Sequence, residues 1–288
     1  IRTLGLSASS MVSVTDLICS ATALLASMMA FAALNVCMSL NEANTYTEQD
    51  IQDISNQQSG NRYDVDTTDL NFGITSNLPV SDDGIRISAL NNFATDLMSC
   101  ILLVFITIAT SLFFNAEIKY GFIKNIAGQV NHRADIFLSK AIAMALYTFV
   151  AFVAYFIADF VALSLSRGEV VELYYGDIGK LFACVGIQYI LHVAFACGVG
   201  LVATLTRSSS LSITVGLFSS FGMGMMVSVL LYNFMDINIA KFFVVDNVKA
   251  IIFNAEYKIL YGALAVGIIY TIIYSLAGSI ILKKRDVV

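Results

Sequence analysis

Two titratable side chains, Asp159 and His192, interrupt long apolar stretches of the sequence and are the first candidates for chemistry. An ionisable group within a bilayer is costly, so such residues commonly belong to ion, proton or substrate pathways. For His192 we favour a neutral imidazole hydrogen-bonded to another helix over a transport role. Asp159 is expected to face an outer vestibule or to pair with a basic neighbour. We expect Asp96 simply to be wetted at the outer end of its helix.

The sequence lacks the motifs that would make the chain an enzyme. No G-x-x-x-x-G-K-[ST] pattern is present, so nucleotide phosphates cannot be bound in that way. No H-E-x-x-H pattern or Cys/His cluster indicates a metal, and His192 has no evident acidic companion for nucleophilic catalysis. The acidic run at 64–69 lacks the Gly and Glu of a calcium-binding EF-hand loop. We therefore predict no catalysis and no resident cofactor.

Composition places the chain in a membrane. Hydrophobic residues make up 58% of the 288, charged residues only 13%, and the mean hydropathy is +0.78. A bilayer crossing needs about 20 mostly apolar residues. Six charge-free runs approach or exceed this length, at 17–41, 97–116, 141–158, 181–206, 208–235 and 259–282.

These runs predict an all-α integral membrane protein with six transmembrane helices in a single domain, 1–288. The first crossing is too long and lacks the basic leader of a cleaved signal peptide. Because Ile1 stands where an initiator Met is expected, we predict that a short N-terminal piece precedes it. The expected helices lie at about 12–40, 92–114, 135–166, 177–205, 209–235 and 259–282. In the fifth, Gly216, Gly222 and Gly224 are candidates for close helix packing or flexibility.

The distribution of charge predicts the orientation. Lys and Arg gather after the second run, at Arg207 and in the C-terminal KKRD, and short cytoplasmic loops favour such residues. Both termini are then cytoplasmic, and 41–90, with nine acids against two arginines, is an extracellular loop. No basic patch lies away from the membrane flanks, so a nucleic-acid partner is not expected.

The stretch NAEIKYGFIKNIAGQVNHR at 115–133 is a short amphipathic element between two apolar runs. Phe122, Ile126 and Val130 lie four residues apart, and Gly121 and Gly128 bracket the pattern. Periodicity alone leaves two interpretations open. The element either lies in the lipid headgroup layer or docks into a cytoplasmic partner.

The E-x-x-x-G pattern of Glu117 and Gly121, the amphipathic turn and the following Arg133 resemble the permease subunit of type 2 ABC exporters. The six helices, the cytoplasmic ends and the polar segment 236–258 fit the same family. Phe122 and His132 depart from the Ser or Thr and the Pro that the family often has at these places.

The resemblance implies that 115–133 is a cytoplasmic coupling element and that 236–258 forms an extracellular re-entrant segment. It also implies two separate ATPase subunits, and ATP and Mg would bind to these subunits and not to this chain. A second copy of the chain is expected to complete the pathway. The expected setting is a bacterial cell membrane, with lipid around the bundle and a multi-pass topology. The implied ATPase-coupling residues are Glu117, Gly121, Phe122, Lys124, Ile126, Gly128 and Arg133.

Few charges line the expected pathway, which suits a hydrophobic or amphipathic cargo such as a membrane-active peptide, in toxin export or antimicrobial-peptide resistance. Candidate pathway residues are Asp159, His192, Phe218, Phe221 and Met225. Two alternatives remain. An ion-coupled transporter without an ATPase would show paired intramembrane acids and broken helices. A membrane sensor or receptor would use the acidic loop at 41–90.

Overall fold

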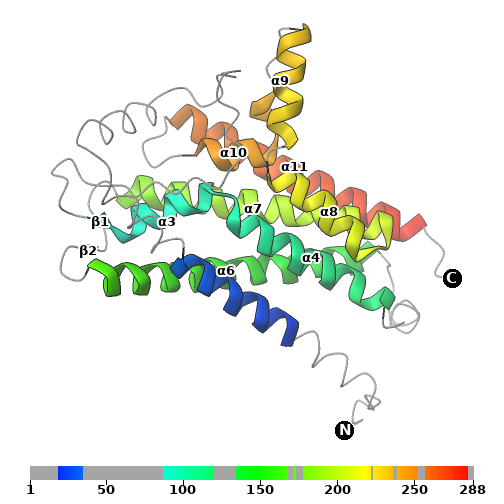
Figure 1. Ribbon diagram of the computed structural model, residues 1–288. Helices are drawn as coiled ribbons and strands as arrows, with labels where there is room; N and C mark the ends of the chain where they lie inside the picture. The colour runs from blue at the N-terminus through cyan, green and yellow to red at the C-terminus, as the bar shows by residue number, and fades with distance from the viewer. Residues whose placement is uncertain are drawn as a thin grey trace.

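The computed structural model is a bundle of helices that run roughly side by side, with one short helix projecting from it (Figure 1). Two strands of two residues each, β1 (Ile87–Ser88) and β2 (Val171–Glu172), pair in parallel at one end of the bundle. The structure describes residues 19–34, 87–119, 134–167, 171–172, 178–221, 223–235, 239–251 and 257–284.

Three helices are long and apolar enough to cross a membrane: α6 (Ala134–Arg167), α7 (Ile178–Thr206) and α11 (Tyr257–Lys284). A fourth crossing is formed if the bent pair α3 (Ala89–Met98) and α4 (Ile101–Lys119) counts as one span. An N-terminal helix, Cys19–Leu34, is apolar but shorter. A multi-pass membrane protein is therefore plausible, with three or four crossings among the described residues and not the predicted six.

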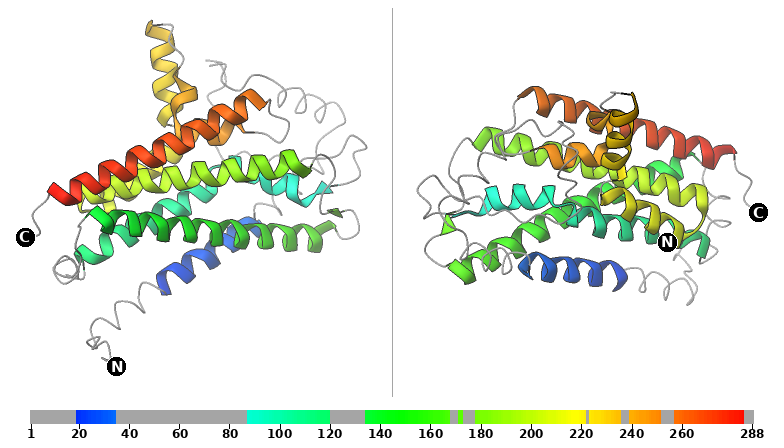
Figure 2. Two further views of the ribbon diagram at one scale, coloured as in Figure 1. Left: turned by 180° about the vertical axis from the view of Figure 1, so that it is seen from behind. Right: turned by 45° about the horizontal axis from the view of Figure 1, so that its top comes forward.

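Helix α7 forms the centre of the bundle, and α4, α6, α8, α10 and α11 all pack against it. Of its most apolar window, 56% is buried inside the protein, compared with 11% for α11. Such a difference is expected when one helix is surrounded by protein and the other faces outward. The ends of α4, α7 and α11 and the start of α6 lie at the same end of the bundle (Figures 1 and 2). The predicted orientation requires this arrangement of the basic flanks.

The predicted second helix is not continuous. It bends by 59° between its two parts, Asn92–Met98 and Ile101–Ala116. Cys100 adopts a left-handed backbone conformation with φ of 61°, which an α-helix cannot accommodate. The Ser99 hydroxyl donates to the Asp96 carbonyl oxygen at 2.6 Å and the Ser99 amide donates to it at 3.0 Å, so that carbonyl remains satisfied at the break.

The prediction of one fifth helix over 209–235 is wrong. Two helices stand there, α8 (Ser209–Ser220) and α9 (Met223–Met235), and α9 projects away from the bundle (Figure 1). The sequence Phe-Gly-Met-Gly at 221–224 explains the break, because Gly costs a helix about 1 kcal/mol relative to Ala. A helix of the length of α8 reaches only about 18 Å, short of a hydrocarbon core of about 30 Å.

Between α9 and α11 the chain forms a short 3-10 turn, η2 (Ala240–Phe242), and a seven-residue helix, α10 (Val244–Ala250). Helix α10 packs against α7, α11 and α3, and most of its residues are buried. Gln188 of α7 donates its side-chain amide to the Val248 carbonyl oxygen at 2.8 Å, which ties α10 to the bundle centre. Asn247 caps the turn by donating to the carbonyl oxygens of Lys241 and Phe243 at 2.8 and 2.7 Å.

Glycines set the closest helix approaches. A Cβ at Gly216 of α8 would collide with the Thr107 side chain of α4, and one at Gly278 of α11 would collide with the Phe137 ring of α6. Phe137 is fully buried and its ring centroid lies 5.2 Å from that of Phe114, so the ring has little room to move. The close-packing interpretation of Gly216 therefore agrees with the structure.

We predict that Gly278→Ala destabilises the protein whereas Gly262→Ala on the same helix does not. A methyl group at 278 overpacks the buried Phe137 site, at a cost of about 1–3 kcal/mol. No atom of the described residues lies within 4 Å of a Cβ at Gly262, so only the gain in helix propensity acts there. Thermal unfolding of both variants in lipid nanodiscs checks this, and equal melting temperatures would contradict the packing of α11 on α6.

Candidate functional site

The predicted ATPase-coupling residues lie almost entirely outside the described part of the chain. Glu117 belongs to α4, near its end, and its side chain is not described. The remaining coupling residues lie outside the described residues altogether: Gly121, Phe122, Lys124, Ile126, Gly128 and Arg133. Their role therefore stays a prediction.

The predicted pathway residues do not come together. Asp159 and His192 are fully buried inside the bundle, whereas Phe218 and Phe221 are 64% and 51% exposed on its surface. Met225 lies in α9, and its side chain is not described. Asp159 and His192 are therefore interior polar groups, whereas the sequence did not show which face of the fifth segment turns inward; the pathway role of all five residues stays a prediction.

Asp159 belongs to a buried polar cluster formed by α3 and α6. Asn92 donates its side-chain amide to Asp159 Oδ1 at 2.8 Å, and the other oxygen, Oδ2, has no hydrogen-bond partner among the described residues. Tyr155 donates its hydroxyl to Asp96 Oδ2 at 3.4 Å. Asp96 and Asp159 are close enough to interact electrostatically.

The expectation that Asp96 is wetted is therefore wrong, because its side chain is only 4% exposed. The bend at Cys100 explains this, since it turns α3 across the faces of α6 and α7. Two carboxyl groups in one dry site repel when both are ionised, and a shared proton or a bound cation relieves that repulsion. The cluster can therefore hold positive charge or a proton.

His192 is bonded within its own helix, which corrects the expectation of a bond to another helix. Its Nδ1 lies 2.7 Å from the Gln188 carbonyl oxygen, so Nδ1 carries a proton and donates it to this bond. Nε2 has no hydrogen-bond partner in the described part of the chain, and the ring meets Phe152 edge-on, with centroids 5.0 Å apart. This imidazole therefore serves packing between α7 and α6.

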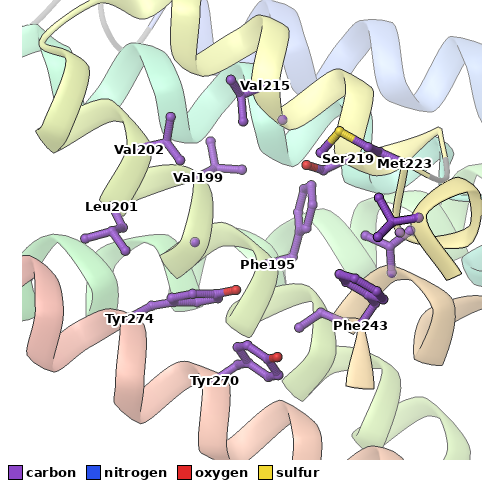
Figure 3. A pocket seen from close by; sticks show the side chains of 16 residues that line it. Phe195, Val199, Leu201, Val202, Val215, Ser219, Met223, Phe243, Tyr270 and Tyr274 are labelled. Carbon is purple, nitrogen blue, oxygen red and sulfur yellow. The ribbon is translucent and has the colours of Figure 1, made fainter. Parts of the chain in front are cut away.

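An apolar cavity of about 310 Å³ lies between α7, α8, α9, α10 and α11. Its size falls at the lower end of the range of small-molecule sites, which is roughly 300–1,000 Å³. Figure 3 shows Phe195 of α7 projecting into it, with Tyr270 and Tyr274 of α11 on one side and Val215 and Ser219 of α8 on the other.

Tyr274 reaches the cavity because the facing position on α7 is a glycine. A Cβ at Gly198 would lie 3.0 Å from Cε2 of Tyr274, tighter than ordinary van der Waals contact. The rings of Tyr270 and Tyr274 lie 5.3 Å apart, in a tilted arrangement along one face of α11. The cavity wall therefore combines aliphatic side chains with aromatic faces.

A buried acid lies behind one wall of this cavity: a Cβ at Gly224, which lines the cavity, would stand 3.0 Å from Oδ2 of Asp246, although Asp246 itself is not a lining residue. Asp246 of α10 is 8% exposed, and neither carboxylate oxygen has a hydrogen-bond partner among the residues that the structure describes. Burial raises the pKa of Asp246 to about 6, and the positive charge of Lys249 offsets part of that rise. The sequence analysis missed this residue because it sits in a segment of mixed charge that gives no apolar signal.

No family model matches the chain, and no curated protein matches it either.

We predict that Asp159→Asn leaves the protein as stable as the original or more so, whereas Asn92→Ala destabilises it. Asn at 159 keeps an acceptor for Asn92 and cannot ionise beside Asp96. Removing the Asn92 amide leaves a buried carboxyl oxygen without its donor, at a cost of about 1–3 kcal/mol. Thermal unfolding in nanodiscs is the measurement, with Asp135→Asn at the exposed start of α6 as the control. The reverse order of stabilities would contradict the described cluster.

Proposed function

We propose that the chain is the membrane-spanning permease subunit of an ATP-driven ABC exporter for hydrophobic or amphipathic cargo. The observation that carries the proposal is the folding of 240–250 into a 3-10 turn and a seven-residue helix packed onto the bundle beside an apolar cavity. The sequence resemblance expects a short re-entrant helix at this place. In this proposal two copies enclose the pathway and a separate ATPase docks at 115–133.

The contacts of α4 with α8 support a connection between the docking element and the cavity. The last turn of α4, which ends at Lys119, belongs to the proposed coupling element 115–133, and α4 meets α8 where Thr107 faces Gly216. Gly216 also lines the cavity. A displacement at the foot of α4 would therefore reach the cavity wall through one packed contact.

This chain contributes differences in binding between conformations and no covalent chemistry. ATP hydrolysis in the partner supplies the free energy, and cargo moves because the cavity binds it more tightly in one state than in another. The break between α8 and α9 gives the cavity two walls that need not move as one body.

An ion-coupled transporter is the second candidate, and one observation favours it. The buried pair of Asp96 and Asp159, together with the broken helices, is the signature that such a transporter is expected to show. The sensor alternative depends on 41–90, of which 41–86 lies outside the described residues.

We predict that the tagged chain co-purifies from native membrane with a P-loop ATPase, near one to one, and that Phe122→Asp abolishes this. A charge on the apolar face of the coupling element would prevent its docking. Lys283→Glu, an exposed charge reversal at the end of α11, is the control and should retain the partner. Recovery of the well-folded chain alone would contradict the proposal.

Transport in proteoliposomes separates the two candidates. The exporter requires ATP and its ATPase, and it continues when a protonophore collapses the proton gradient. The ion-coupled transporter works without ATP, stops with the protonophore, and loses activity in Asp159→Asn.

A further inference from the structure

The described residues that line the apolar cavity carry no charge. They are aliphatic and aromatic residues, glycines, one methionine and one serine. Asp246 lies behind the wall, and both of its carboxylate oxygens are covered by protein. A charged ligand would therefore lose its hydration here without meeting an exposed counter-charge, which is costly. The cavity suits a neutral molecule.

Three hydroxyl groups on the cavity wall have no hydrogen-bond partner among the described residues. They belong to Tyr270 and Tyr274 of α11 and to Ser219 of α8, and each oxygen keeps some accessible surface. Neighbouring hydroxyls on the same helices behave differently. Ser220 donates to the Gly216 carbonyl oxygen at 2.7 Å, and Thr271 donates to that of Gly267 at 2.8 Å. The cavity hydroxyls are therefore available to a ligand.

The two tyrosines present their hydroxyls side by side. Their ring centroids lie 5.3 Å apart, and in Figure 3 both side chains extend from α11 toward Phe195 and Phe243. Ser219 enters from α8 on the other side of the cavity. Each hydroxyl has one proton to donate, and a carbonyl oxygen has two lone pairs that can accept. A carbonyl group would therefore satisfy donors that the protein leaves unpaired.

We propose that this cavity binds a neutral organic molecule with an apolar body and a carbonyl oxygen, such as an aromatic ketone, an ester or a tertiary amide. The aliphatic and aromatic side chains pack around the body, and the hydroxyls of Tyr270 and Tyr274 donate to the carbonyl oxygen. The role of such a molecule as cargo rests on the proposed exporter function, whereas its binding does not.

The size and position of the cavity agree with this ligand. A volume of about 310 Å³ accommodates one small molecule. Val215, Met223 and Val227 line the cavity and are 40%, 44% and 38% exposed, so a ligand could reach it from the side of α8 and α9. A lipid acyl chain would also fit apolar walls, but along its length it offers the three hydroxyls no acceptor.

The test is photolabelling of the purified full chain in nanodiscs with benzophenone, followed by mass spectrometry of the labelled peptides. Benzophenone is neutral and aromatic, and its irradiated carbonyl bonds covalently to a nearby C–H group, so the label marks its position. We expect saturable labelling of lining residues such as Met223. Diphenylmethane has the same two rings without the carbonyl oxygen, and as a competitor it should bind about tenfold more weakly at equal concentration in the lipid.

Tyr270→Phe and Tyr274→Phe each remove one hydroxyl and keep the ring. We expect each to weaken benzophenone binding by about two- to tenfold and to leave diphenylmethane unchanged. Tyr261→Phe makes the same change on α11 at a residue that is 67% exposed and does not line the cavity, and it should alter neither ligand. If either tyrosine variant fails to fold, Ser219→Ala removes the hydroxyl of α8 and should also weaken benzophenone selectively.

Several outcomes would overturn the site. Equal affinities for benzophenone and diphenylmethane, or tyrosine variants that bind benzophenone as the original does, would show that the hydroxyls do not recognise a carbonyl. Unsaturable labels spread over α6 and α11 would show partition into lipid only, and an unlabelled lining would indicate a lipid chain in the cavity. Specific labelling without any recovered ATPase would uphold the site and overturn only the exporter function.

Discussion

Hydrocarbon offers no hydrogen-bond partner, so polar side chains within this bundle must find theirs in the chain itself. Many hydroxyl groups do so on their own helix: Thr148, Thr204 and Thr271 donate to the carbonyl oxygen four residues earlier, each at 2.8 Å. Others connect helices, as when Lys140 of α6 donates to the Phe114 carbonyl oxygen of α4 at 3.1 Å. These bonds satisfy part of the buried polar side chains and, where they join two helices, help to hold the bundle together.

Some buried polar atoms have no partner among the described residues, and they include neutral groups such as the Thr107 and Ser228 hydroxyls as well as two carboxyl groups. Within the described part of the chain, Asp159 keeps one oxygen without a partner, and Asp246 keeps two. The first lies between α3 and α6, and the second beside the cavity enclosed by α7 to α11, so the two sites are built from different elements. A buried carboxylate without hydrogen-bond donors lowers the stability of the fold, so binding a proton or a ligand at such a group would stabilise the protein most.

The long helices were predictable, and the interruptions were not. Charge-free length alone identifies α6, α7 and α11, because few other structures need so many apolar residues in succession. The bend at Cys100 depends on a left-handed backbone at a residue with no preference for it, which composition does not reveal. The glycines at 222 and 224 indicate a possible break between α8 and α9. The prediction nevertheless placed one helix over 209–235, because the whole stretch is apolar and long enough to cross a membrane. Spacing could have found both sites: Asn92 and Asp96, Tyr155 and Asp159, and Tyr270 and Tyr274 each lie four residues apart, on one helix face.

Because Thr107 packs directly against Gly216, a tilt of α4 would be transmitted to α8. Thr107 stands twelve residues before Lys119, about 18 Å along the helix axis, so a tilt of about 5° at its foot would carry Thr107 roughly 1.5 Å sideways. A glycine offers no side chain that could bend and absorb such a displacement. The α8 backbone would have to follow, and the cavity would change width by an amount comparable to the radius of a methyl group.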